Sequence, residues 1–226
     1  MHIEPGVVGP AKMVLSYVTA TGVIGATAKL AYDHLKEYGL ISLLLKSILA
    51  TIIVFSCFEV LPHYPIGVSE VHLILGTTIF LVLGIAPATI GLASGLLIQG
   101  IFFAPFDLPQ YGINVTTLLA SMLALNFAVK KIIPAGTAYK DISYSQMLKM
   151  SVIWEGAIVS WVAFWAFYGQ GFSAENISNV LSFGGAYMSV VLIEPLVDLA
   201  VLAGVKALTK SNECSTTFVD KKLCNI

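Results

Sequence analysis

The sequence has few charged side chains and no arginine. Asp, Glu, Lys and Arg together make up 11% of the 226 residues, and hydrophobic residues make up 57%. Ordinary globular chains are about 25% charged. The mean hydropathy of +0.87 points the same way. This composition excludes an ordinary soluble domain, and it offers no basic, aromatic-interleaved surface for nucleic acid.

Cysteine is scarce, and several catalytic motifs are missing. Cys57 lies in an apolar run, and the spacing of Cys214 and Cys224 matches no structural zinc pattern. The sequence contains no GxxxxGKS/T phosphate-binding loop, no HExxH zinc motif and no GxSxG nucleophile elbow. We therefore expect a chain that is not an enzyme, carries no cofactor and hydrolyses no ATP itself.

Long apolar runs recur along the whole chain. A transmembrane helix needs roughly 20 mostly apolar residues, and runs without period-two alternation exclude a membrane barrel. The runs lie at about 11–32, 40–61, 70–86, 87–105, 112–133, 147–168 and 180–206. We predict an all-α, polytopic membrane helix bundle with seven transmembrane helices. Six helices remain the alternative, because the third and fourth runs are short and meet at Pro87.

The predicted bundle forms one membrane-embedded domain over residues 1–210. Residues 211–226 are polar and are expected to form a disordered cytoplasmic tail. Ala26-Thr27-Ala28 resembles a signal-peptidase site, but the segment before it lacks the positive start of a signal peptide. We therefore expect the first helix, and the residues before it, to be retained.

Lysine placement predicts the orientation in the membrane. Cytoplasmic loops carry an excess of basic residues. With the amino terminus outside, every lysine except Lys12 flanks an inner loop or lies in the tail, whereas the loops at 62–69, 105–112 and 168–178 contain none. We predict an outer amino terminus and a cytoplasmic carboxy terminus in the inner, or plasma, membrane.

Two of the four histidines suggest a metal site on the outer side. The α-amine of Met1 and the amide and Nδ1 nitrogens of His2 can close small chelate rings around one ion. A planar nitrogen set suits Ni(II) or Cu(II). His72, at the outer end of the third apolar run, could fill the fourth corner, or it could be an ordinary hydrogen-bonded core residue. His34 is expected on a solvated inner face and His63 in an outer turn.

Neighbouring polar residues could support these ligands. Glu70 or a hydroxyl could orient the His72 ring through its second nitrogen, as ligand histidines usually require. Asn114, where the fifth helix begins, could hold a neighbouring loop through its side-chain amide.

Four carboxylates fall within apolar runs, where ionisable groups are costly and usually functional. They are Glu59, Glu155, Glu194 and Asp198. Glu194 and Asp198 are spaced i,i+4 and share one helix face. A cation path, a proton relay, a partner contact and a structural polar network all remain open. If they form a relay, the chain would be an autonomous secondary cation transporter using Glu155, Glu194 and Asp198.

Several motifs resemble those of the substrate-binding, or S, component of cobalt and nickel energy-coupling-factor transporters, the CbiM/NikM family. The matching residues are Met1-His2-Ile3 with Gly6, Leu61-Pro62, Ser69-Glu70-Val71-His72 with Gly76, Leu96-Leu97-Ile98-Gln99, and Gly112-Ile113-Asn114 with Met122. The chain departs from the family at Glu70-Val71, where a Ser/Thr-rich stretch is common, and in the loop at 104–109, where Gly-Gly is often found.

The resemblance implies a fold and a site. The amino terminus would tuck into the bundle, and Met1, His2 and His72 would hold the transported Ni(II) or Co(II) in a square plane. It also implies partners supplied by other chains: a transmembrane coupling (T) component, two ATPase subunits and a small accessory membrane subunit. Such a complex could serve cobalamin biosynthesis.

Overall fold

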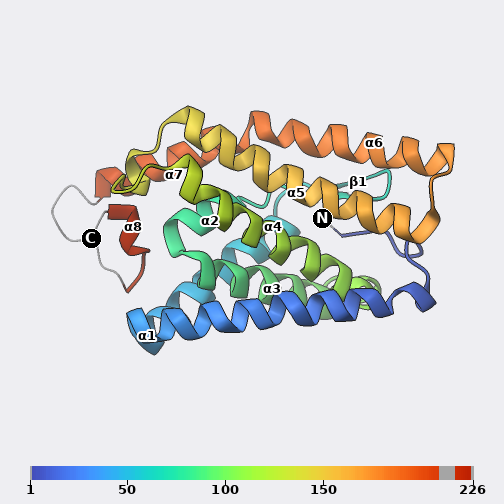
Figure 1. The fold of residues 1–226 in the computed structure, drawn as a ribbon, viewed down its shortest axis with the longest axis horizontal. Helices are drawn as coiled ribbons and strands as arrows, with labels where there is room; N and C mark the ends of the chain where they lie inside the picture. Colours follow the sequence, from blue (N-terminus) through green and yellow to red (C-terminus); the bar gives the residue numbers. More distant parts are fainter. Residues whose placement is uncertain (1, 209–216, 225–226) are drawn as a thin grey trace.

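The fold is a bundle of helices (Figure 1). This structure is a computed structural model that describes residues 2–208 and 217–224. The helices are α1 (Val14–Glu59), α2 (Gly76–Leu83), α3 (Ile85–Phe102), α4 (Tyr111–Ile132), α5 (Tyr144–Gln170), α6 (Ala174–Ser189), α7 (Glu194–Leu208) and α8 (Lys221–Cys224). The long helices α1, α3, α5 and α6 run roughly along one direction, with α4 oblique to them (Figure 1). Short 3-10 turns lie at Pro10–Lys12, Pro105–Gln110, Tyr139–Asp141 and Val190–Leu192. The predicted all-α bundle is confirmed.

Five helical stretches among the described residues are long and apolar enough to cross a membrane. They are Pro10–Glu59, Ile85–Phe102, Pro105–Ile132, Tyr144–Gln170 and Ala174–Gly204. The first contains two of the predicted segments, because α1 is interrupted at Gly39 by a non-helical residue with φ 83° and ψ 169°. Glycine adopts such positive φ values without a Cβ clash. The interruption divides the 46 residues of α1 into two arms.

The third predicted segment, 70–86, is not one long helix. A hairpin of β1 (Tyr64–Ile66) and β2 (Ser69–Val71) is followed by residues 72–75, which form no regular structure and end with Leu75 in the left-handed region (φ 55°, ψ 37°), and then by α2. The 8 residues of α2 extend about 12 Å, which is too short for a hydrocarbon core about 30 Å thick. The chain nevertheless runs the length of the bundle here. Gly67 lies against Asn179 near the start of α6, and Gly84 lies against Asp220 beside α8.

Close helix packing around α3 follows from its small residues. A Cβ on Gly91 would collide with Ala50, and one on Gly95 would collide with Val54, both on the second arm of α1. Glycine at these positions lets the two backbones approach closely, as the small-residue pattern of membrane helix interfaces predicts. Gly112 at the start of α4 packs in the same way against Ser16 of the first arm.

The last predicted segment, 180–206, is longer and divided. It begins at Ala174 with α6 and continues as α7 after a short 3-10 turn at Val190–Leu192. Pro195 lies in the first turn of α7, where the missing N–H is tolerated. Figure 1 shows α6 and α7 following one another along one edge of the bundle.

The tail differs from the expected disordered segment where the structure describes it. Residues 217–224 lie against the bundle: the Asp220 N–H donates to the Val82 carbonyl at 2.7 Å, and Leu223 is fully buried. Lys221 also pairs with Glu37 at the end of the first α1 arm. An apolar side chain and a charge partner therefore hold these residues in place. Residues 209–216 and 225–226 lie outside the described part of the chain.

Candidate metal centre

The amino-terminal residues pair with the edge of the hairpin. Ile3 and Ser69 form an antiparallel bridge. The Glu4 N–H donates to the Val68 carbonyl and the Glu70 N–H donates to the His2 carbonyl, both at 3.1 Å. The Ser69 hydroxyl also donates to the His2 carbonyl, at 2.9 Å. Figure 1 shows this segment running inward beside β1.

A second anchor comes from α4. The Ile3 N–H donates to the side-chain oxygen of Asn114 at 3.0 Å, and Asn114 is 2% exposed. Asn114 therefore holds the amino-terminal segment by its backbone. Further along, Gly6 turns the chain with a positive φ of 91°, and Val7 packs against Gly169 at the end of α5.

His2 and His72 meet inside the bundle. Their side chains are 2% and 1% exposed, and their ring centroids are 5.2 Å apart. Phe58, near the end of α1, lies 5.3 Å from each of the two rings. His63 stacks on the outer side of His72 at 4.9 Å. The two histidines are thus brought together, as the sequence predicted. The ring contacts of Phe58 and His63 with them were not predicted.

Glu70 lies between the two rings. One oxygen, Oε2, is 2.9 Å from Nδ1 of His2 and 3.0 Å from Nε2 of His72. Within the described residues, His2, Glu70 and His72 form the group of metal-ligating side chains close enough together to hold an ion. Nε2 of His2 and Nδ1 of His72 are buried without a hydrogen-bond partner among the described residues.

The electrostatics leave this group ready to bind a cation. Burial lowers the pKa of His2 to about 4 and that of His72 to about 2, so both rings are neutral at pH 7. Burial on its own raises the pKa of Glu70, but hydrogen bonds with the two histidines outweigh it and bring the pKa below its ordinary value. Because Glu70 is ionised, Nδ1 of His2 and Nε2 of His72 donate to it, and the lone pair of each neutral ring lies on the opposite, unpartnered nitrogen. A shift of each ring proton to that opposite nitrogen would free Nδ1 of His2 and Nε2 of His72 for a metal.

Two further nitrogens were predicted as ligands, the amine of Met1 and the backbone amide of His2. Met1 lies outside the described residues, so its amine remains a prediction. The amide nitrogen of His2 takes part in no hydrogen bond among the described residues. A hollow of about 10 Å³, close to the size of one water, adjoins His2. It is lined by His2, Leu96, Gln99, Gly100, Asp107, Leu108, Tyr111 and Asn114.

Asp107 is a buried carboxylate that the sequence reasoning missed. It is 6% exposed in the 3-10 turn at Pro105–Gln110. The prolines at both ends of this turn could have signalled a rigid segment. His34 also differs from the expected solvated residue: it is 7% exposed and stacks on Tyr38 at 4.5 Å.

Three of the four intramembrane carboxylates gather around the start of α2. Glu155, Glu194 and Asp198 are each 0% exposed. The Thr78 hydroxyl donates to Asp198, and Glu155 interacts with Glu194 and Tyr187. Glu59 lies elsewhere, at the end of α1.

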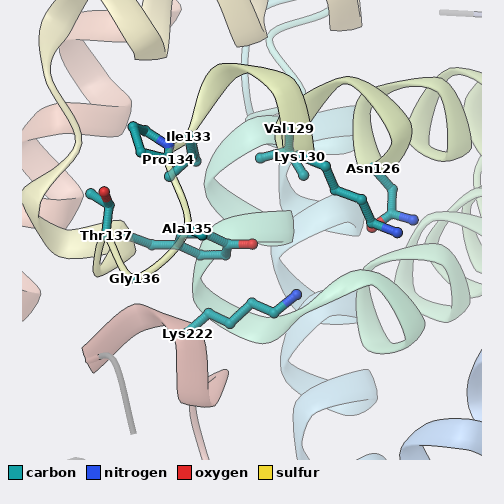
Figure 2. Close-up of a pocket in the computed structure, with 10 residues that line it drawn as sticks. Asn126, Val129, Lys130, Ile133, Pro134, Ala135, Gly136, Thr137 and Lys222 are labelled. Atoms are coloured by element: carbon teal, nitrogen blue, oxygen red, sulfur yellow. The ribbon is translucent and has the colours of Figure 1, made fainter.

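The hollow drawn in Figure 2 lies at the opposite end of the bundle from the histidines. It measures about 270 Å³ and is formed by the end of α4, the loop after it and Lys222. Figure 2 shows Lys130 and Lys222 extending toward this space. Its lining contains no histidine and no carboxylate, so it does not have the chemistry of a cation site.

The fold and the histidine pair define a multi-pass membrane protein with a buried candidate metal centre. The chain belongs to the CbiM family, described as the cobalt uptake substrate-specific transmembrane region, whose model matches residues 2–211. This confirms the family suggested by the motifs, and it makes the chain a membrane protein of metal uptake. Such a role agrees with the expectation of a non-enzyme.

A solved structure shares the fold. It is described as a crystal structure of a transition metal transporter, and the two chains superpose with a TM-score of 0.71. The match covers 94% of this chain and 95% of that chain at 16% sequence identity. At this identity the likeness supports the fold alone. Among curated proteins, none matches the chain.

Proposed function

We propose that this chain is the metal-capture subunit of an ATP-driven energy-coupling-factor importer and that its substrate is Ni(II) or Co(II). The observation that carries the proposal is the meeting of His2 and His72 in one buried site. Residues from the start of the chain and from the hairpin converge there through backbone hydrogen bonds. A structural role alone would not require an N-terminal residue to be threaded into the bundle.

The proposed ligands are the terminal amine of Met1, the amide and Nδ1 nitrogens of His2, and Nε2 of His72. Nε2 of His72 and Nδ1 of His2 face the same carboxylate oxygen, so both nitrogens point at one place. Imidazole and amine nitrogens suit nickel and cobalt. Binding through the amide nitrogen displaces its proton, so capture of the ion releases protons.

The lysine distribution supports an inner-membrane orientation with the amino terminus outside. In that orientation the hairpin, His2 and His72 lie toward the outer side. The charged residues near Gly39 and the described tail residues lie toward the cytoplasm. The metal would therefore enter the site from the outer side.

ATP hydrolysis is assigned to other chains, because this sequence has no phosphate-binding loop. The proposed complex contains a transmembrane coupling component, two ATPase subunits and a small accessory membrane subunit. Co-purification of this chain with ATPase subunits from its native membrane, and metal uptake that stops without ATP, test this assembly.

A metal titration of the purified full chain tests the capture step. We expect about one ion per chain. His2→Ala, or one residue added before Met1, should abolish binding, because each change removes a chelating nitrogen. His34→Ala is the matched control, since that ring stacks on Tyr38 far from the site. Unchanged binding in both altered chains would overturn the proposal.

The buried carboxylates favour one other candidate, an autonomous secondary cation transporter using Glu155, Glu194 and Asp198. Complete burial of three carboxylates is costly unless they pair or serve transport. Liposomes containing this chain alone should then show gradient-driven metal uptake. The capture-subunit proposal expects no such uptake without the partner chains.

A further inference from the structure

We propose that Glu70 is itself a metal ligand, and that its oxygen sets which ion this chain prefers. This inference rests on the proposed function and adds an oxygen donor to the nitrogen ligands named above. Oε2 of Glu70 faces the same two ring nitrogens that would hold the metal, one from each histidine.

The distances match the edges of a coordination polyhedron. Metal–ligand bonds of about 2.1 Å at right angles put neighbouring ligand atoms about 3.0 Å apart. Oε2 lies 2.9 Å from Nδ1 of His2 and 3.0 Å from Nε2 of His72. One ion can therefore contact all three atoms with small movements of the side chains. If the nitrogens define a plane, the oxygen takes an axial position above it.

Which ring nitrogens Glu70 contacts indicates whether it is a metal ligand or a residue that only orients the ligand rings. A carboxylate that orients a ligand histidine usually accepts from the ring nitrogen that does not bind the metal. Here those outer nitrogens, Nε2 of His2 and Nδ1 of His72, have no hydrogen-bond partner among the described residues. Glu70 instead faces Nδ1 of His2 and Nε2 of His72, where an ion would replace the ring protons, which move to the unpartnered nitrogen of the same ring.

The backbone fixes Glu70 in this position. Its N–H donates to the His2 carbonyl at 3.1 Å, so the carboxylate and the amino-terminal residue move as one unit. The side chain of Glu70 is 21% exposed, compared with 2% for His2 and 1% for His72. The oxygen is thus the most accessible of the three donors and would be the first to meet an arriving cation.

Charge also favours the added ligand. A dication held by neutral rings in a dry site carries uncompensated charge, and burial of such charge is costly. The Glu70 carboxylate supplies one negative charge at contact distance, and a deprotonated His2 amide would supply the other. The bound complex would then carry no net charge.

The oxygen changes the preferred ion. Four nitrogens in a plane favour Ni(II) and Cu(II). An axial carboxylate oxygen raises the coordination number from four to five, a geometry that Co(II) accepts as readily as Ni(II). We therefore assign Glu70 as the residue that moves the selectivity of this chain toward Co(II).

The test uses the purified full chain loaded with Ni(II) alone and with Co(II) alone. X-ray absorption at the metal should show five nitrogen and oxygen ligands, and the Ni(II) complex should be paramagnetic. In Glu70→Ser the Ni(II) complex should become four-coordinate and diamagnetic. Co(II) affinity should fall about 100-fold and Ni(II) affinity about 10-fold, by comparison with the 10- to 100-fold effect of losing a supporting residue.

Glu4→Gln is the matched control, because Glu4 is a carboxylate on the neighbouring amino-terminal segment and lies outside the His2–Glu70–His72 group. It should leave the coordination number and the affinity ratio unchanged. A four-coordinate, diamagnetic Ni(II) complex in the unaltered chain would overturn the inference, and this measurement needs no variant to fold. An unchanged Co(II)/Ni(II) ratio in a folded Glu70→Ser chain would overturn it equally.

The two proposals fail in different ways. If metal binding survives both His2→Ala and the residue added before Met1, the proposed function is wrong. If those changes abolish binding while the Glu70→Ser chain keeps the native metal spectrum, only the role of Glu70 is wrong. Glu70 would then be an acceptor that leaves when the ion arrives.

Discussion

The backbone N–H of Ile3 donates to the side-chain oxygen of Asn114 at 3.0 Å, joining the start of the chain to the first turn of α4. This single bond fixes the residue next to His2 from the opposite wall of the site. Together with the bridge between Ile3 and Ser69, it holds the amino-terminal segment from two sides. The position of His2 therefore depends on residues far away in the sequence.

Removing the Asn114 side chain should weaken metal binding. Asn114→Ala leaves the buried Ile3 N–H without a partner, which costs about 1–3 kcal/mol and corresponds to about a 5- to 150-fold loss of affinity if all of it falls on the bound state. Metal titration measures the change. Asn126→Ala, on the same helix but beside the hollow in Figure 2, should bind as the parent does. Equal affinities in the two variants would contradict the anchoring role.

Metal affinity should rise with pH through the neutral range, although the rings do not titrate there. The pKa values of about 4 for His2 and about 2 for His72 mean that both imidazoles have already lost their extra proton by pH 6. Any protons released on binding near pH 7 must therefore come from the His2 amide or the terminal amine. Calorimetry in buffers of different ionisation enthalpy counts these protons. Binding without proton release would exclude the amide as a ligand.

Enlarging Gly76 should destabilise the fold. A Cβ at this position would overlap the indole of Trp154, and overpacking of this kind costs about 1–3 kcal/mol. Thermal unfolding in detergent should show a lower Tm for Gly76→Ala. Gly156→Ala is the control, since a Cβ there meets no atom within 4 Å. A Tm equal to that of the control would show that α2 shifts freely.

Thr78→Val should separate stability from metal capture. The change removes the hydroxyl that donates to the buried Asp198 carboxylate, and a buried acceptor left without its donor costs about 1–3 kcal/mol. We expect a lower Tm with unchanged stoichiometry and affinity for the metal. A lost or weakened metal site would instead place Asp198 on the path of the ion.

The elements that depend on apolar length were predictable from the sequence. Hydropathy identified the α-helical bundle, and its runs correspond to both arms of α1 and to α3, α4 and α5. Hydropathy overestimated the helical length of the third segment, because a window over 70–86 averages the end of strand β2, the irregular residues 72–75 and α2 into one apolar run. Hydropathy does not register the hydrogen-bonding pattern, which is what distinguishes these three.

The site was predictable in part. The unusual position of His2 and the outer location of His72 indicated that the two rings could meet, and the structure brings them together. The inward-facing carboxylate of Glu70 could not be inferred, because strand register decides on which side of a ring a neighbouring side chain lies. The docked residues 217–224 were missed for a similar reason. One buried leucine and one ion pair hold a segment whose composition is otherwise polar.

Helix α2 is fastened at both ends. Thr78 in its first turn contacts Asp198, and the Val82 carbonyl in its last turn accepts the N–H of Asp220. His72 precedes this helix by three residues, 73–75, that form no regular structure. The short helix α2 thus lies between His72 and residues 217–224 at the far end of the molecule. The only chain between the His72 ring and the contact of α2 with residues 217–224 is this helix and residues 73–75.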